Sequence, residues 1–301
     1  MTTKHLHALV RTYLVDHGSR FRLKDVDPDG TRDPYSDQGA AKAALQEGKD
    51  RLRALQEKLY AQDQWGALLI FQAMDAAGKD GCIEHVMSGV NPQGCDVSAF
   101  KQPSSEELDH GFLWRTVRRL PERGRIGIFN RSYYEEVLVV RVHPEILANQ
   151  KLPRSVAGKD LFDRRYEDIN AHERYLARNG YVIRKFFLHI SKEEQTKRFQ
   201  DRVNDSEKQW KFSLGDLREQ ERWDDYMDAY ENAIRHTATK DAPWFVIPAN
   251  HKWFARLVVV AAIVDALEQL DLDFPKLTAA KRKELEEGRK ILKQRISSGS
   301  T

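Results

Sequence analysis

Residues 67–81 read ALLIFQAMDAAGKDG, an apolar run that ends in a turn of small residues and a Gly-Lys pair. A continuous apolar run of this length is typical of a strand buried on both faces. The sequence continues with helical character through Met87, so it predicts a strand, a tight loop and a helix in succession. Such a loop binds phosphate because backbone N–H groups and the helix N-terminus surround an anion, and a lysine adds a point charge.

This loop departs from the general phosphate-loop pattern G-x-x-x-x-G-K-[ST]. Ala73 replaces the first glycine, and Asp80 replaces the hydroxyl that holds magnesium in that pattern. Asp75, inside the loop, offers an oxygen ligand instead. The alternative is a surface turn with an incidental lysine, but the buried strand before the loop favours phosphate binding by Ala76, Ala77, Gly78, Lys79, Asp80 and Gly81.

A second apolar strand, at residues 125–129, leads into a polar tip within the sequence GRIGIFNRSYYEE of residues 124–136. In open α/β sheets ligands bind at the carboxyl ends of the strands. Residues 113–141 hold seven arginines and three acidic residues, and arginine forks recognise phosphate. We expect Arg131, beside the strand tip, to bind phosphate, whereas a solvated surface is favoured for most of Arg118, Arg119, Arg123 and Arg125.

Strands and helices alternate along the chain. Further strands are predicted at residues 97–100, 182–190 and 244–247, and amphipathic or buried helices at 38–62 and 254–267. This alternation predicts an α/β fold with a parallel sheet that helices flank on both sides.

Residues 195–236 form a long charged region with helical character and a break near residues 212–215. We expect two helices that project from the sheet as a lid. The functional interpretation is a basic groove that closes over a polyanion, and the alternative is a salt-bridged surface in which acidic neighbours balance the charge. We favour the groove for Arg198, Arg202, Lys208 and Lys211.

Composition limits the remaining possibilities. The 301 residues carry 49 Lys plus Arg against 46 Asp plus Glu, so a net charge of +3 excludes a generally nucleic-acid-coating protein. Two cysteines without metal spacing fit a reducing cytosol and argue against zinc. The start of the chain predicts no secretory segment, and the most apolar stretch, residues 254–267, is too short to span a bilayer. We therefore expect a cytoplasmic protein without a membrane partner. Residues 1–37 are predicted to be an N-terminal arm and residues 273–301 a charged helix and tail.

Four strings resemble the polyphosphate kinase 2 family, and the similarity extends over about residues 38–272. They are FQAMDAAGKDG at 71–81, VMSGVNPQG at 86–94, FNRSYYE at 129–135 and WKFS at 210–213. The resemblance implies a thymidylate-kinase-like P-loop kinase fold with a helical lid. It also implies Mg²⁺-dependent phosphoryl transfer between inorganic polyphosphate and nucleotides, in a protein that associates into homo-oligomers.

The resemblance also implies roles for individual residues. Many members carry Asp where this chain has Asn130 and Asn where it has Glu135, and the swapped pair resembles class III members, which phosphorylate AMP and ADP. Asp75 and Glu135 would then hold Mg²⁺, while Lys79 and Arg131 neutralise the transferred group. Polyphosphate would be gripped by the lid, and Lys101, Arg115 and Asn130 would contact the acceptor nucleotide.

Other functions remain open at this point. An ATP-dependent nucleotide kinase would need the same loop. A non-catalytic protein that binds polyphosphate or nucleotide would keep the fold without turnover, although Lys79 together with Asp75 and Glu135 argues against it. Nucleic-acid binding is weaker, because no stacking platform of aromatic residues is evident.

Overall fold

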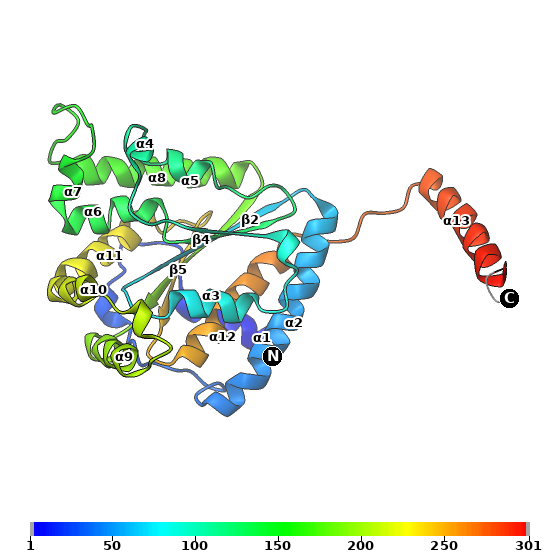
Figure 1. The fold of residues 1–301 in the computed structure, drawn as a ribbon, viewed down its shortest axis with the longest axis horizontal. Coiled ribbons are helices and arrows are strands. Elements are labelled where there is room, and N and C mark those ends of the chain that lie inside the picture. The colour runs from blue at the N-terminus through cyan, green and yellow to red at the C-terminus, as the bar shows by residue number, and fades with distance from the viewer. Residues whose placement is uncertain (1–2, 299–301) are drawn as a thin grey trace.

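The computed structural model describes residues 3–298, and its core is a sheet with helices on both faces (Figure 1). Within these residues the sheet has six strands in the order β1-β6-β5-β2-β4-β3. All neighbouring strands are parallel except β1, which pairs antiparallel with β6. The strands are β1 Leu14–Val15, β2 Gly66–Ala73, β3 Cys95–Ala99, β4 Ile126–Asn130, β5 Tyr181–His189 and β6 Trp244–Pro248.

Helices cover both faces of the sheet, which confirms the predicted α/β fold. One face carries α1 Thr3–Tyr13, α2 Gln38–Gln62, α3 Lys79–Met87 and α12 Lys252–Glu268, and the other carries α8 Leu161–Arg178 and α11 Trp223–Thr237. Short helices lie around the second face, namely α4 Ser105–Leu108, α5 Trp114–Val117, the 3₁₀ turn η3 Tyr133–Glu136, α6 Val139–Val142 and α7 Pro144–Ala148.

The burial of β2 and α12 accounts for the apolar patterns in their sequences. β2 lies in the middle of the sheet between β4 and β5, and its residues 66–72 are buried, which accounts for the unbroken apolar run. α12 is buried on nearly all sides, so its sequence is apolar throughout. α2 begins where Asp37 accepts a hydrogen bond from the Ala40 N–H (2.9 Å), and it spans the predicted residues 38–62.

The start of the chain differs from the expected arm. Leu6, Leu9 and Val10 of α1 are buried in the core, where α1 packs against α12, and β1 extends the sheet beyond β6. Residues 3–15 are therefore part of the folded body. The reason is their spacing, because positions 6, 9 and 10 share one helix face.

The lid region also differs from the expected two helices. It contains α9 Lys192–Asn204, α10 Leu214–Glu219 and α11, joined by the 3₁₀ turns η4 Gln209–Lys211 and η5 Gln220–Arg222. The break near residues 212–215 is confirmed, because Ser213 caps α10 by accepting a hydrogen bond from the Gly215 N–H. α11 does not project. Its Ala229, Tyr230 and Ile234 are buried, so the lid proper is residues 192–222.

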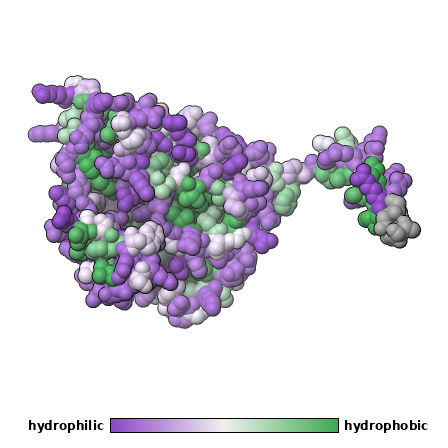
Figure 2. Space-filling view, in the orientation of Figure 1, coloured by the Kyte–Doolittle hydropathy of each residue, from purple (hydrophilic) through white to green (hydrophobic). Residues whose placement is uncertain are grey.

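A tail helix, α13 Ala279–Ser298, lies apart from the body and is exposed along its length, as a charged surface helix was expected to be (Figures 1 and 2). Figure 2 shows a mainly hydrophilic surface on the visible face of the body, with smaller hydrophobic patches. No helix within residues 3–298 is long and apolar enough to cross a membrane.

Candidate functional site

The predicted phosphate loop lies where expected, between the central strand β2 and helix α3. Gly78 adopts a left-handed backbone conformation with φ +92°, which a glycine takes without strain, and it directly precedes the first turn of α3. Ala76 is also left-handed, with φ +62°. The first N–H groups of a helix have no partners within it, so the start of α3 offers donors to an anion.

Lys79 opens α3 and is 8% exposed, so its ammonium group is held inside the site. Burial lowers the pKa of Lys79, and the nearby Arg131 guanidinium lowers it further. The carboxylates of Asp75, Glu135 and Asp80 act in the opposite direction. A phosphate in the loop would add negative charge and so favour the charged ammonium.

The tip of β4 brings the second predicted group beside the loop. The Arg131 Nη2 atom lies 3.0 Å from Asp75 Oδ1, and its Nη1 atom lies 3.6 Å from Glu135 Oε2. Arg131 itself is left-handed, with φ +62°, and its N–H donates to the Phe71 carbonyl of β2 (3.0 Å). The guanidinium therefore joins the two carboxylates that were predicted as metal ligands.

Residues from two neighbouring strands contact the Glu135 carboxylate, namely Gln72 of β2 and Arg131, which follows β4. The Gln72 side chain of β2 donates to Glu135 Oε1 (3.1 Å). Burial raises the pKa of Glu135, although Arg131, Lys79 and the Gln72 hydrogen bond oppose that rise. Next to it, the Asn130 amide donates to Asp80 Oδ1 (2.6 Å), so Asn130 and Asp80 are linked across the mouth of the loop.

A cavity of about 480 Å³ opens from this loop toward the lid. Its lining residues include eight cationic side chains and three carboxylates, so it suits a polyanion. The cations are Lys79, Lys101, Arg131, Arg198, Arg202, Lys208, Lys211 and Lys252, and the acids are Asp75, Asp80 and Asp201.

The lid residues in this wall differ in how firmly they are held. Lys208 is exposed and pairs with Asp205, and Lys211 lies 5.0 Å from the centre of the Trp210 ring. The Arg202 Nη1 atom is 3.7 Å from Asp216 Oδ2, which leaves the guanidinium at the cavity. These three cations line the cavity, and their binding of a polyanion stays a prediction.

Arg198 was expected to bind polyphosphate, but its side chain binds the phosphate loop itself. Its guanidinium is buried and donates to the carbonyl oxygens of Ala76 and Ala77 (3.2 and 2.7 Å) in the phosphate loop. It also donates to the carbonyls of Ala249 and Asn250 and to the Glu194 carboxylate. These contacts use all five N–H donors of an arginine, so Arg198 fixes the loop.

The two residues expected at the acceptor nucleotide are separated. Lys101 follows β3 and lines the phosphate cavity, whereas Arg115 lines a neighbouring cavity of about 510 Å³ together with Phe112 and Gln150. The Arg115 Nη2 atom donates to the Lys101 carbonyl (2.7 Å). Arg115 thus contacts the segment that carries Lys101 and does not reach the loop.

Three side chains in or beside the cavity were missed by the sequence reading. Lys252 lines the cavity from the start of α12, and the Gln195 amide on α9 donates to the Asp75 carbonyl (2.8 Å). Gln72 holds Glu135. Lys252 follows the predicted strand 244–247 by a few residues, so the rule that ligands meet strand ends could have found it. The two glutamines left no comparable signal.

Asp75 and Glu135 offer hard oxygen ligands of the kind that Mg²⁺ prefers. Within residues 3–298 no cluster of three or more His, Cys, Asp or Glu side chains could hold a metal by itself. A cation that keeps waters and uses substrate phosphates needs only one or two carboxylates, so the pair fits such an ion. The loop, the carboxylate pair and the cation-lined cavity, on a parallel sheet, define a phosphotransferase with a P-loop kinase fold.

Comparisons with known proteins narrow this class. Residues 35–275 match the family model of polyphosphate kinase 2, and the chain belongs to that family. A Rhodopseudomonas palustris protein named ADP-polyphosphate phosphotransferase is 56% identical over 78% of this chain and 82% of its own length. A Meiothermus ruber protein named AMP/ADP-polyphosphate phosphotransferase is 44% identical over 91% of this chain and 98% of its own. The crystal structure of polyphosphate kinase 2 from Arthrobacter aurescens superposes with a TM-score of 0.84 at 43% identity, covering 93% of this chain and 96% of that one.

Proposed function

We propose that the protein transfers the terminal phosphoryl group of inorganic polyphosphate to AMP and to ADP, with Mg²⁺ as the metal. The observation that carries this proposal is a single cavity that is lined by cations from both the phosphate loop and the lid. A nucleotide alone would not need Lys208 and Lys211 on the lid, whereas a long polyanion would use cations of both the loop and the lid. The names of the relatives support the same pair of substrates.

Phosphoryl transfer needs alignment and charge neutralisation more than covalent chemistry. The loop residues 76–81 bind the phosphates nearest the reaction through their backbone. Lys79 and Arg131 approach that point from α3 and from the tip of β4, so they neutralise charge on the group in transfer. Arg198 and Gln195 keep the loop in the required shape from behind.

Asp75 and Glu135 would hold Mg²⁺, directly or through water. When bound, the ion would neutralise and orient phosphate oxygens. The two carboxylates share Arg131, whose guanidinium lies 3.0 Å from Asp75 and 3.6 Å from Glu135. Glu135 therefore supplies the carboxylate that position 130 lacks, since Asn130 is neutral and contacts Asp80.

Donor and acceptor would enter from different sides. Arg202, Lys208, Lys211 and Lys252 line the lid side of the cavity and would bind the polyphosphate chain. Lys101 and Asn130 lie on the side of the β3 and β4 tips and would meet the acceptor phosphate. Arg115 would act there through its hydrogen bond to the Lys101 carbonyl.

Three expectations about location and partners belong to this proposal. The protein would act in the cytoplasm, in keeping with its two free cysteines. It would act without nucleic acid, in keeping with its net charge of only +3. It would also form homo-oligomers. Light scattering of the purified protein measures this, and we expect a mass above that of one chain.

The deciding experiment incubates purified protein with Mg²⁺, long-chain polyphosphate and either AMP or ADP, and measures product over many turnovers. We expect ADP and ATP to accumulate. A parallel reaction with ATP and AMP but no polyphosphate tests an ATP-dependent nucleotide kinase, and product only in that reaction would overturn the proposal. Binding of polyphosphate without product from either acceptor would instead identify a non-catalytic binding protein.

A further inference from the structure

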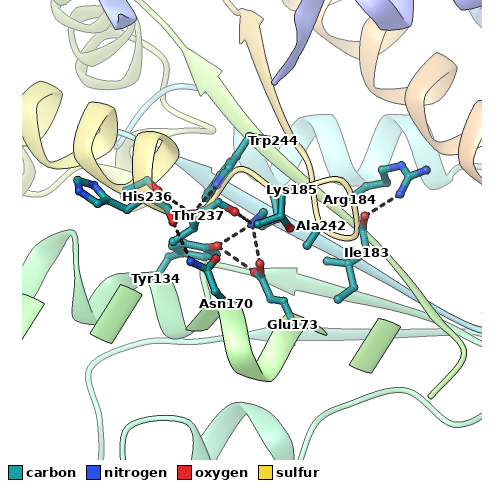
Figure 3. A network of polar contacts seen from close by, with 12 residues as sticks. Tyr134, Asn170, Glu173, Ile183, Arg184, Lys185, His236, Thr237, Ala242 and Trp244 are labelled. Carbon is teal, nitrogen blue, oxygen red and sulfur yellow. Dashed lines mark hydrogen bonds and ion pairs between the residues drawn. The ribbon is translucent and has the colours of Figure 1, made fainter. Parts of the chain in front are cut away.

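A buried polar network lies between η3, α8 and β5, and Figure 3 shows its members Tyr134, Glu173 and Lys185 pointing toward one another. It joins Tyr133 and Tyr134 of η3, Glu173 of α8 and Lys185 of β5. The four side chains are 0–1% exposed. None of them lines the cavity or is needed by the proposed chemistry, so the network requires another explanation.

Both tyrosines bind the same carboxylate. The Tyr133 and Tyr134 hydroxyls donate to Glu173 Oε1 at 2.8 and 2.9 Å. The Lys185 ammonium donates to Glu173 Oε2 (2.7 Å), to the Tyr134 hydroxyl oxygen (2.8 Å) and to the Thr237 carbonyl at the end of α11 (2.8 Å). All three N–H donors of the lysine are used, and each Glu173 oxygen has at least one donor.

Such an arrangement is costly unless it is complete. Removing charges from water is unfavourable, and a well-packed apolar cluster would stabilise a core at least as well as a buried ion pair. Stability alone therefore does not explain why the two tyrosines carry hydroxyl groups here. The hydroxyls add a defined orientation, because their hydrogen bonds fix the η3 side chains relative to α8 and β5.

The turn that is fixed in this way carries the site. Arg131 and Glu135 stand on either side of Ser132, Tyr133 and Tyr134, and Glu135 lies directly after the second tyrosine. Arg131 has φ +62°, a strained conformation for a residue with a side chain, and such strain persists only where surrounding contacts overdetermine it.

The far side of the turn is fixed as well. Arg165 on α8 donates to the Glu136 carbonyl (2.8 Å), and the Gln150 amide donates to its carboxylate (2.7 Å). Glu135 thus lies between two anchored neighbours, while its own side chain is turned to Gln72 and Arg131.

We propose that Tyr133, Tyr134, Glu173 and Lys185 form a positioning network that holds Arg131 and Glu135 against the phosphate loop. None of the four touches the reacting groups, so they are positioning residues. The role in turnover rests on the proposed function, but the fixing of the turn does not. The two claims can therefore fail separately.

The test compares Tyr134→Phe with a matched control, Tyr181→Phe. Each variant removes one hydroxyl from a ring that packs in or against the core. The Tyr181 hydroxyl donates to the Pro121 carbonyl (3.0 Å) at the start of β5, whereas the site lies at the carboxyl ends of the strands. Tyr133→Phe, which removes a single donor and no acceptor, is the milder variant if Tyr134→Phe does not fold. Hydrogen exchange of the peptide that covers residues 131–136 is measured in the free protein, and kcat and KM are measured with polyphosphate and AMP.

In Tyr134→Phe we expect the 131–136 amides to exchange at least about tenfold faster than in Tyr181→Phe. We expect kcat to fall about tenfold while KM for polyphosphate changes by less than about twofold, because the lid cations are untouched. Equal exchange of this peptide in the two variants would overturn the proposal, and so would equal losses of kcat. If the wild-type protein transfers nothing from polyphosphate, the proposed function fails, and the exchange data still decide the fate of the network.

Discussion

The two walls of the phosphate cavity are built in opposite ways. On the body wall, Lys79 is buried and Arg131 is held by two carboxylates, so each charge has one position. On the lid wall, Lys208 and Lys211 are exposed; Lys208 pairs with Asp205, and Lys211 lies over the Trp210 ring. Buried, fixed charges suit the stabilisation of a transition state, whereas exposed charges suit the binding of a polyphosphate chain whose phosphates are all alike. We therefore propose that the body wall serves catalysis and the lid wall serves binding of polyphosphate.

The largest effect is expected on the body wall. Lys79→Met removes the buried charge with little loss of side-chain volume, and kcat should fall by two to three orders of magnitude, as about 3–4 kcal/mol of lost transition-state stabilisation implies. Steady-state kinetics measure it, and Lys283→Met on the exposed helix α13 is the control. A rate near that of the wild type would remove Lys79 from the mechanism.

The carboxylate pair gives the next effect. Glu135→Gln keeps the shape and the contact with Gln72 but removes the charge, so the Mg²⁺ concentration for half-maximal activity should rise by about tenfold or more. A titration of activity with Mg²⁺ measures this rise. Glu84→Gln, on the exposed face of α3, should leave the titration unchanged, and an unchanged titration in both variants would contradict the assignment.

Arg198 sharpens the comparison because it lies on lid helix α9 but belongs to the body wall. Arg198→Lys keeps the charge and loses the fork that holds the Ala76 and Ala77 carbonyls, so kcat should fall about tenfold and the melting temperature should fall by several degrees. Arg202→Lys, one turn further along α9, should alter neither quantity appreciably. Identical behaviour of the two variants would show that Arg198 is not special.

For the double variant Lys208→Gln/Lys211→Gln we expect weaker binding of polyphosphate with catalysis unchanged. Both side chains are exposed, so the melting temperature should stay the same while KM for polyphosphate rises by about three- to tenfold and depends less on salt. The measurement is KM at two ionic strengths. A large fall in kcat at saturating polyphosphate would place these lysines in the chemistry instead.

The smallest effect concerns how the lid is attached. His143 lies 2.8 Å from Glu145 and 2.7 Å from Glu219 of α10. Although burial lowers the pKa of His143, hydrogen bonds to the two glutamates outweigh that effect and raise it. The contact therefore stabilises the fold below the ordinary histidine pKa and loses this contribution as pH rises through the raised value. The melting temperature of His143→Gln should accordingly fall further below wild type at pH 5.5 than at pH 8.5, and the reverse order would be evidence against the attachment.

Local patterns predicted most of the fold. The apolar run of β2 and the amphipathic spacing of α2 depend only on which faces are buried, so their positions agreed with expectation. α1 was missed because three buried positions in a mixed segment made a weak signal. α11 was assigned to the lid because its charges are visible in sequence, whereas its packing against α8 is not.

The site was predictable where it follows strand ends. Asp75, Lys79, Arg131 and Glu135 came together because parallel strands place their carboxyl ends at one edge. The part that Arg198 plays was not predictable, since it depends on how close α9 approaches the loop carbonyls. The same is true of Arg115, whose side chain turns toward a neighbouring cavity.

The separation of catalysis from grip is tested most directly by kcat and polyphosphate KM, measured in parallel for Lys79→Met and Lys208→Gln/Lys211→Gln. We expect Lys79→Met to lose at least about a hundredfold in kcat with KM within about threefold of the wild type, and the lid variant to show a raised KM with kcat preserved. Both variants changing the same parameter in the same proportion would contradict the division of work between the two walls.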